Sequence, residues 1–407
     1  MPTNLIGLFG IVAILGIALA FSSNRKAINL RIVGAAFGLQ VAIAAFVLYF
    51  DAGRAVIDTL STGVLKVIGY SKAGIDMVFG PLADTNVVGF SFAINVLPII
   101  IFFAALMSVM YHLRIMEWVV KLVGGFLHKV IGTGAVESMN AAANVFVGQT
   151  EAPLVVRPYL KNLTEPQMFA VMVSGLASIA GTVLAGYVLM GAELKYLLAA
   201  AFMAAPGGLL MAKILMPDEH VVKAGEHEKL IMEPSQHRNV ILAAASGTTD
   251  GLRLAANIGA MLIAFVALIA LFNGIVGGIS GWFGYELTLE KILGWIFRPL
   301  MFLLSVPWSE AQAAGALFGE KLILNEFVAF SHLTERLAGM SERTHAVVTF
   351  SLCGFANLSS IAILLGGLGV LVPEKRDLIG ILGIKAVLAA SLSNLMSAAL
   401  AGLLLTF

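Results

Sequence analysis

The apolar residues of this chain fall into long uninterrupted runs, and the polar positions lie mostly between those runs. Runs of about 20 apolar residues can cross about 30 Å of hydrocarbon as helices. A membrane β-barrel would instead show alternating segments of about ten residues, and the chain lacks that pattern. Eight membrane spans are predicted, at 4–21, 32–50, 90–111, 168–190, 196–216, 255–276, 346–371 and 378–405.

Composition supports the same fold class. Of the 407 residues, 59% are hydrophobic and 12% are charged, and the mean hydropathy is +0.95. Soluble domains carry about 25% charged residues, so we expect an all-α polytopic membrane protein. Cys353 is the single cysteine, which excludes a disulfide framework and a thiolate metal cluster and suggests a packing role.

Basic residues gather in the loops that follow the first, third, fifth and seventh spans. Loops rich in Lys and Arg lie on the cytoplasmic side of a membrane. Both chain termini are therefore expected on the extracytoplasmic side. The basic residues behind this prediction are Arg25, Lys26, Arg31, Arg114, Lys121, Lys129, Lys213, Lys223, Lys229, Arg238, Lys375 and Arg376.

Two short polar patches interrupt the apolar sequence, and each contains a glutamate. The first patch, 144–153, contains Glu151, and the second, 319–329, contains Glu326. A carboxylate at membrane depth costs about 2.5 to 3.5 kcal/mol even on the more permissive scale, so it usually belongs to a substrate, ion or proton pathway. Both patches are therefore candidate sites.

Each patch is predicted to lie in a re-entrant hairpin, because irregular backbone at membrane depth is tolerated only where protein or water covers it. The two hairpins cover about 136–163 and 298–332. Amphipathic segments at 111–129 and 285–296 are expected to form interfacial helices, the first on the cytoplasmic side and the second outside.

The two halves of the chain resemble each other after each hairpin. Thr164 with Gln167 fits a capping box and Ser341 fits an N-cap, so each is expected to start a membrane helix. Each helix then has a cluster of small and polar residues, at 174–181 and 351–360, which indicates either close helix packing or a broken helix. By the charge argument the two units run in opposite directions, as in the inverted repeats of secondary transporters, whose site lies where the repeats meet.

This organisation divides the chain into four predicted parts. Residues 1–135 form N-terminal scaffold helices and an interfacial helix, and residues 136–216 form the first repeat. Residues 217–297 contain a cytoplasmic loop, a scaffold helix and the outer interfacial helix, and residues 298–407 form the second repeat.

The first patch suits a planar heterocycle. Gln149, Thr150 and Glu151 offer an amide, a hydroxyl and a carboxylate in succession, which match the donors and acceptors along the edge of such a ring. Phe355 is one of several aromatic residues able to stack on the ring, although single aromatic residues more often serve packing.

The second patch suits a sugar. Glu326, Asn357 and Ser360 offer a carboxylate, an amide and a hydroxyl to vicinal sugar hydroxyls. Neither patch contains Arg, which an anionic substrate would favour, so the two patches together suit a nucleoside. Lys321 lies in the same hairpin and is expected to pair with Glu320 or with another buried carboxylate or carbonyl.

A cation site is a further possibility near the first hairpin. Asn144, the carbonyl groups of Val147 and Ile179, and the hydroxyl of Ser178 would give the all-oxygen shell that a hard monovalent cation prefers. Spacing alone does not establish this site.

Two other function classes are weighed against transport. A channel or facilitator would need polar residues along a continuous pore, whereas this chain concentrates them at two hairpins and two helix breaks. An intramembrane enzyme that used Glu151 and Glu326 as acid and base would need a nucleophile or a metal, for which the sequence has no recognisable motif. Transport is therefore favoured.

The runs 148–153, 319–329 and 355–360 together closely resemble the concentrative nucleoside transporters, over nearly the whole chain. The resemblance implies a homotrimer in which spans such as the third and sixth form a scaffold, while the hairpins and broken helices form an elevator-like moving domain. It implies uptake of nucleosides such as uridine across a bacterial inner membrane, driven by sodium, with no other cofactor and no enzymatic activity.

The resemblance also implies roles for single residues. Some members of the family use protons, but Asn144 and Ser178 match the sodium-type pattern and favour sodium. The implied residues are Gln149, Thr150 and Glu151 with Val183 nearby for the base, Glu326, Asn357 and Ser360 for the ribose, and Asn144, Val147, Ser178 and Ile179 for sodium.

Overall fold

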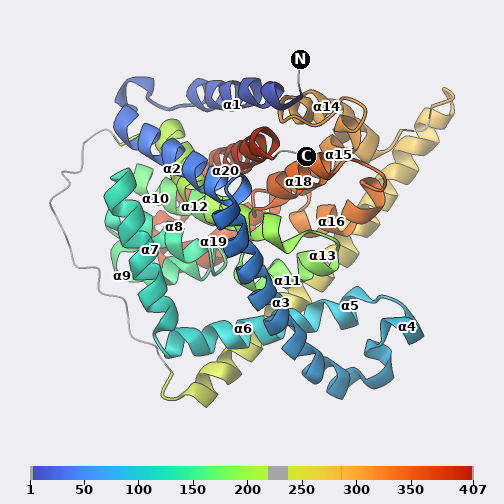
Figure 1. The fold of residues 1–407 in the computed structure, drawn as a ribbon, viewed down its shortest axis with the longest axis horizontal. Helices are drawn as coiled ribbons and strands as arrows, with labels where there is room; N and C mark the ends of the chain where they lie inside the picture. Colours follow the sequence, from blue (N-terminus) through green and yellow to red (C-terminus); the bar gives the residue numbers. More distant parts are fainter. Residues whose placement is uncertain (1–2, 219–236, 286, 406–407) are drawn as a thin grey trace.

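The structure is a computed structural model that describes residues 3–218, 237–285 and 287–405, and every regular element in these ranges is a helix (Figure 1). The all-α expectation is confirmed for this part of the chain. Lys223 and Lys229, two of the loop residues used to orient the chain, lie outside the described residues.

Six segments of the described chain are long and apolar enough to cross a membrane. They coincide with six of the predicted spans, whereas the first and seventh spans correspond to shorter apolar helices in α1 (Thr3–Ala20) and α19 (Ser359–Leu371). The six segments contain α2 (Leu30–Leu48), α5 with α6 (Phe92–Asn95 and Leu97–His112), α10 with α11 (Glu165–Ala177 and Gly181–Leu189), α12 (Leu194–Leu215), α13 (Val240–Gly281) and α20 (Arg376–Leu404).

The helix α3 (Asp51–Phe79) has no counterpart among the predicted spans. Charged residues recur along its 29 residues, so no apolar run marks it in the sequence, yet Ile57 and Ile75 bury one of its faces. The turn from α2 into α3 requires Gly53, because a Cβ atom there would lie 1.8 Å from the carbonyl oxygen of Phe46. A search for apolar runs misses such an amphipathic helix.

Both predicted hairpins are present as paired short helices. The second starts at Ala311 and not near position 298, because Arg298 belongs to α14 (Leu289–Leu303). An interfacial helix was expected at 111–129, and α7 (Ile115–Ile131) occupies that region. The first hairpin consists of α8 (Ala135–Asn144), an irregular stretch at 145–151, η3 (Ala152–Val156) and α9 (Arg157–Leu160), and the second of α15 (Ala311–Ile323) and α16 (Glu326–Ser331), followed by α17 (Leu333–Arg336).

The helices that follow the hairpins are both broken. The first starts at a capping box, in which Thr164 N–H donates to Gln167 Oε1 over 2.9 Å, and it is interrupted between α10 and α11. The second starts after the N-cap Ser341 and is interrupted between α18 (Glu342–Leu352) and α19. Each small-residue cluster therefore contains a helix break, and close packing is present as well, because a Cβ atom at Gly181 would lie 2.7 Å from the carbonyl oxygen of Phe146.

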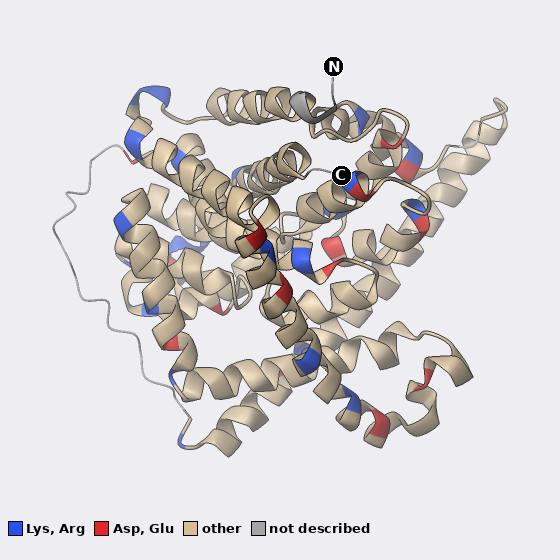
Figure 2. Ribbon diagram, viewed as in Figure 1, with Lys and Arg blue, Asp and Glu red and all other residues tan. Residues whose placement is uncertain are grey.

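The helix α20 packs against both broken helices, and its middle is buried between them. Charged residues are sparse along the whole ribbon (Figure 2). In the described part of the chain, the buried charged side chains are those of Glu137, Lys213, Glu320, Lys321 and Glu326.

Two groups of these buried charges form ion pairs. Lys213 Nζ lies 2.5 Å from Glu137 Oε1 and 2.6 Å from Asp218 Oδ2, which ties the start of the first hairpin to the end of α12. Glu320 lies 2.8 Å from Arg336 Nη2 and 3.1 Å from His332 Nδ1, which ties α15 to the residues after α16. The first group lies at the start of the first hairpin, and the second joins the tip end of α15 to α17.

Candidate substrate and ion site

The carboxylate of Glu326 lies at the tip of the second hairpin, as the first residue of α16. Asn325 caps this helix by accepting a hydrogen bond from Val328 N–H over 3.0 Å. Glu326 Oε1 accepts from the hydroxyl of Tyr187 over 3.1 Å, and Oε2 accepts from Asn357 Nδ2 over 3.0 Å. The two donors hold the carboxylate in a fixed orientation, with Glu326 only 3% exposed.

The break between α18 and α19 orients the rest of the second patch. Asn357 Oδ1 accepts from Ser360 N–H over 2.9 Å and from the hydroxyl of Ser359 over 2.7 Å. The amide of Asn357 therefore points its nitrogen at Glu326, and the structure brings together the three predicted sugar-binding residues.

Tyr187 was not found from the sequence, although its hydroxyl is a direct partner of Glu326. Its ring is fully buried, with centroids 4.8 Å from Phe327 and 4.4 Å from Phe330. A phenolic hydroxyl in an apolar span is a possible signal, because a buried hydroxyl needs a partner.

The predicted base-binding residues separate into buried and accessible ones. Gln149 is buried, and its Nε2 lies 3.4 Å from the hydroxyl of Ser360, while its Oε1 has no partner. Thr150 packs against Gly367 of α19, where a Cβ atom would lie 2.6 Å from Thr150 Cγ2. Glu151 is exposed, and the carboxylate of Glu326 is hydrogen-bonded to Tyr187 and Asn357 and not to Glu151.

One continuous chain of hydrogen-bonded polar residues, joined at Ser360 through its hydroxyl and its main-chain N–H, thus crosses from the first hairpin to the second. It runs from Gln149 through Ser360 and Asn357 to Glu326 and Tyr187. The unpaired amide oxygen of Gln149 and the carboxylate lone pairs at the other end are free acceptors for a ligand that carries donors at both ends.

The predicted cation ligands gather where the first hairpin meets the break between α10 and α11. The hydroxyl of Ser178 donates to the carbonyl of Asn144 over 2.5 Å. Asn144 Nδ2 donates to Asn140 O over 2.9 Å, which leaves Asn144 Oδ1 buried without a partner. Val147 and Ile179 lie in the adjoining non-helical segments. An unpaired buried oxygen among other oxygen atoms fits a hard cation.

Val183 and Phe355, the two remaining predicted residues, lie in or directly after the helix breaks. Val183 is buried in the first turn of α11, and Phe355 is half-buried in the second break. The main-chain N–H of Phe355 donates to the carbonyl of Ser178 over 3.2 Å, so the two breaks contact each other directly.

Lys321 was expected to pair with Glu320 or with another buried carboxylate or carbonyl, and the first of these alternatives is wrong. Glu320 pairs with Arg336 and not with Lys321, because successive residues of a helix point about 100° apart. Lys321 Nζ instead donates to the amide carbonyl oxygen of Asn394 on α20 over 2.9 Å. Asn394 lies in the apolar sequence of α20, where no neighbouring residue marks it as a partner of Lys321.

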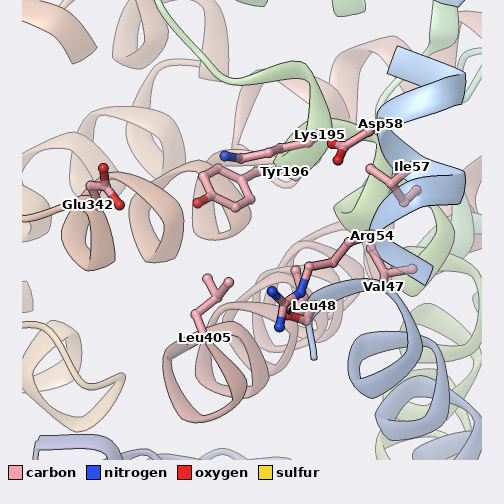
Figure 3. A pocket seen from close by; sticks show the side chains of 9 residues that line it. All are labelled: Val47, Leu48, Arg54, Ile57, Asp58, Lys195, Tyr196, Glu342 and Leu405. Carbon is pink, nitrogen blue, oxygen red and sulfur yellow. Dashed lines mark hydrogen bonds between the residues drawn. The ribbon is translucent and has the colours of Figure 1, made fainter. Parts of the chain in front are cut away.

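A separate cavity of about 240 Å³ contains none of the predicted site residues. It lies between α2, α3 and the first residues of α12 and α18, and Figure 3 shows Arg54, Lys195 and Glu342 on its walls. Arg54 donates to the carbonyls of Leu48 and Tyr49, and Lys195 pairs with Glu193. Both cations are already engaged by protein groups.

Three protein-family models match successive parts of the chain. Residues 9–82 match "Na+ dependent nucleoside transporter N-terminus", residues 93–194 match "Nucleoside recognition", and residues 196–402 match "Na+ dependent nucleoside transporter C-terminus".

Curated relatives and solved structures are similar over the whole chain. "Nucleoside permease NupC" of Helicobacter pylori is 50% identical and covers 98% of both chains. "Sodium/nucleoside cotransporter 1" of Mus musculus is 35% identical, over 99% of this chain and 64% of its own. The structure of CNTnw in an inward-facing substrate-bound state is 50% identical, covers 99% of this chain and 98% of that one, and superposes with a TM-score of 0.94. A CNTnw variant in an outward-facing state, 51% identical with 99% of each chain covered, also gives 0.94.

Proposed function

Because this chain belongs to the Na⁺-dependent, concentrative nucleoside transporter family, whose members are transporters and not enzymes, we propose that it is a symporter that takes up nucleosides such as uridine together with sodium. The observation that carries this proposal is the polar chain from Gln149 to Glu326, which offers acceptors at both ends and spans the two hairpins.

In the proposed mechanism, Glu326 accepts hydrogen bonds from the ribose hydroxyls while Tyr187 and Asn357 hold its carboxylate in place. Gln149, Thr150 and Glu151 contact the base, with Val183 and Phe355 beside it. Asn144, Val147, Ser178 and Ile179 hold the sodium ion that travels with the nucleoside.

The sodium gradient supplies enough free energy for accumulation. One Na⁺ moving through 100 mV contributes about 2.3 kcal/mol, and a tenfold concentration gradient adds about 1.4 kcal/mol. One ion for each neutral nucleoside therefore supports roughly 500-fold accumulation.

The proposal also covers the assembly of the protein, its membrane and its movement. Three chains assemble in a bacterial inner membrane with their termini outside, and the two hairpins move with the broken helices past the scaffold. The similarity to inward-facing, intermediate and outward-facing structures of CNTnw supports such a movement.

Uptake of labelled uridine and adenosine into proteoliposomes tests the function, with Na⁺ and H⁺ gradients imposed separately. Accumulation of unmodified nucleoside that follows the Na⁺ gradient is the expected result. Accumulation that follows only the H⁺ gradient would make the protein a proton symporter, and equilibration without accumulation would make it a facilitator.

Base selectivity is predicted to depend on the first hairpin. Gln149→Ala or Thr150→Ala should change the ratio of adenosine to uridine affinity, because these side chains face groups that differ between the two bases. Binding of both nucleosides to the purified variants measures the ratio. An equal loss for both would contradict a site divided into a base half and a ribose half.

Sodium coupling is predicted to depend on the oxygen cluster. Asn144→Ala combined with Ser178→Ala removes two side-chain oxygens and should weaken the Na⁺ dependence of uridine binding by about fivefold or more. Uridine titrations at several Na⁺ concentrations measure this dependence, and the oligomeric state of the variant serves as the control for folding. Unchanged Na⁺ dependence would refute the assigned ligands.

A further inference from the structure

The side-chain NH₂ group of Asn394 donates one hydrogen bond to each of the two broken helices. It lies in the middle of α20, is 2% exposed, and its Nδ2 is 2.6 Å from the carbonyl of Ala177 and 2.7 Å from the carbonyl of Cys353. Its Oδ1 accepts from Lys321 Nζ over 2.9 Å. One residue therefore joins the first repeat, the second repeat and the second hairpin.

The two carbonyls that Asn394 binds belong to the ends of helices. Ala177 is the last residue of α10, and Cys353 directly follows α18. The last carbonyls of a helix have no partner within it, and an unpaired main-chain group is costly at membrane depth. Asn394 satisfies both ends at once, which fixes the distance between the breaks.

Residue 354 is a glycine, and the absence of a side chain there leaves room for the amide of Asn394. A Cβ atom at position 354 would lie 2.4 Å from Asn394 Oδ1, 2.7 Å from its Nδ2 and 2.8 Å from the carbonyl of Ala177. Only glycine allows the amide to reach both carbonyls without displacement.

The residues that follow each carbonyl are those of the proposed site. Ser178 and Ile179, proposed to bind sodium, come directly after Ala177. Phe355 and Asn357, proposed to bind nucleoside, come shortly after Cys353, and the two segments share the bond from Phe355 N–H to the carbonyl of Ser178.

We propose that Asn394 is a positioning residue that couples sodium binding at the first break to nucleoside binding at the second. This inference rests on the proposed function. A sodium ion on Ser178 and Ile179 orders the first break, and Asn394 transmits that order to the segment that carries Asn357, the partner of Glu326. Because such coupling is reciprocal, nucleoside raises sodium affinity by the same factor.

The test measures the dissociation constant of uridine for purified protein in lipid nanodiscs, in sodium chloride and in choline chloride. The ratio of the two constants is the coupling factor, which is typically about 5 to 150 for coupled sites. A residue with a merely structural role would weaken both constants alike and leave their ratio unchanged.

Two variants break the contact in different ways. Asn394→Asp keeps an acceptor for Lys321 but removes the amide that donates to the two carbonyls. Gly354→Ala keeps Asn394 and adds no charge, but displaces its amide. Both are expected to lower the coupling factor to below about twofold. Gly354→Ala decides the result if Asn394→Asp does not fold.

Ser397→Ala is the matched control. Ser397 lies three residues further along α20, is also buried, accepts from Gln40 Nε2 over 3.0 Å and donates to the carbonyl of Ser393 over 3.3 Å. It should keep the wild-type coupling factor. A wild-type factor in folded Gly354→Ala or Asn394→Asp would overturn the inference, whereas a wild-type protein with no response to sodium would overturn the proposed function itself.

Discussion

Glu326→Gln is expected to lower uridine affinity by about 100-fold or more, since each hydrogen bond to a charged group contributes about 1.5 to 3 kcal/mol. Glutamine keeps the size of the side chain but replaces one accepting oxygen by a donating NH₂ group. That group cannot accept from a ribose hydroxyl or from Tyr187. Calorimetric titration of uridine against the purified variant measures the loss.

Nucleosides that lack ribose hydroxyls give the complementary measurement on the wild-type protein. They should bind poorly, because the carboxylate of Glu326 then stays buried without its ligand donors. Glu151→Gln is the matched control, since it changes the same functional group in the base half and should preserve the discrimination against deoxynucleosides. Uridine binding by Glu326→Gln within threefold of wild type would show that the ribose does not depend on this residue.

Lys213→Met is expected to lower the free energy of unfolding by about 3 to 5 kcal/mol, because removing one partner of a buried ion pair leaves the other charge uncompensated. Glu137 is 1% exposed and Lys213 is 3% exposed, so water cannot replace the lost partner. The measurement is unfolding of the purified protein by heat or denaturant.

Two further variants separate this effect from general damage. Glu137→Gln together with Lys213→Met removes both buried charges, leaves only Asp218, whose side chain is 23% exposed, and should recover most of the lost stability. Lys121→Met breaks a pair of the same length, 2.5 Å to Glu117, in which the lysine side chain is 47% exposed, and should cost no more than about 1 kcal/mol. Equal losses in Lys121→Met and Lys213→Met would contradict the role of burial.

Local signals predicted much of this structure. The capping box at Thr164, the N-cap at Ser341 and the small-residue clusters are features of neighbouring residues, and each marks a helix start or break in the structure. Glutamates in apolar sequence likewise marked the hairpins. These features depend on a few consecutive residues, so a single sequence contains them.

Other features depend on residues far apart in the chain. Tyr187 and Glu326 are 139 positions apart, and Asn394 and Ala177 are 217 positions apart. Tyrosine and asparagine in an apolar span do not indicate their partners. The first part of α13 was missed for another reason, because its polar stretch at 246–253 hides a helix that begins at Val240.

The length of α13 has a consequence for the surrounding lipid. Its 42 residues make a rod of about 63 Å at about 1.5 Å per residue, twice the thickness of a hydrocarbon layer of about 30 Å. Even at a steep tilt of about 40° the rod rises about 48 Å. Part of the rod therefore extends beyond the hydrocarbon layer, and Asp250 and Arg253 are exposed in its first half. The depth of its apolar part then depends on acyl-chain length, so hydrophobic mismatch acts directly on α13 and on α6, which packs along it.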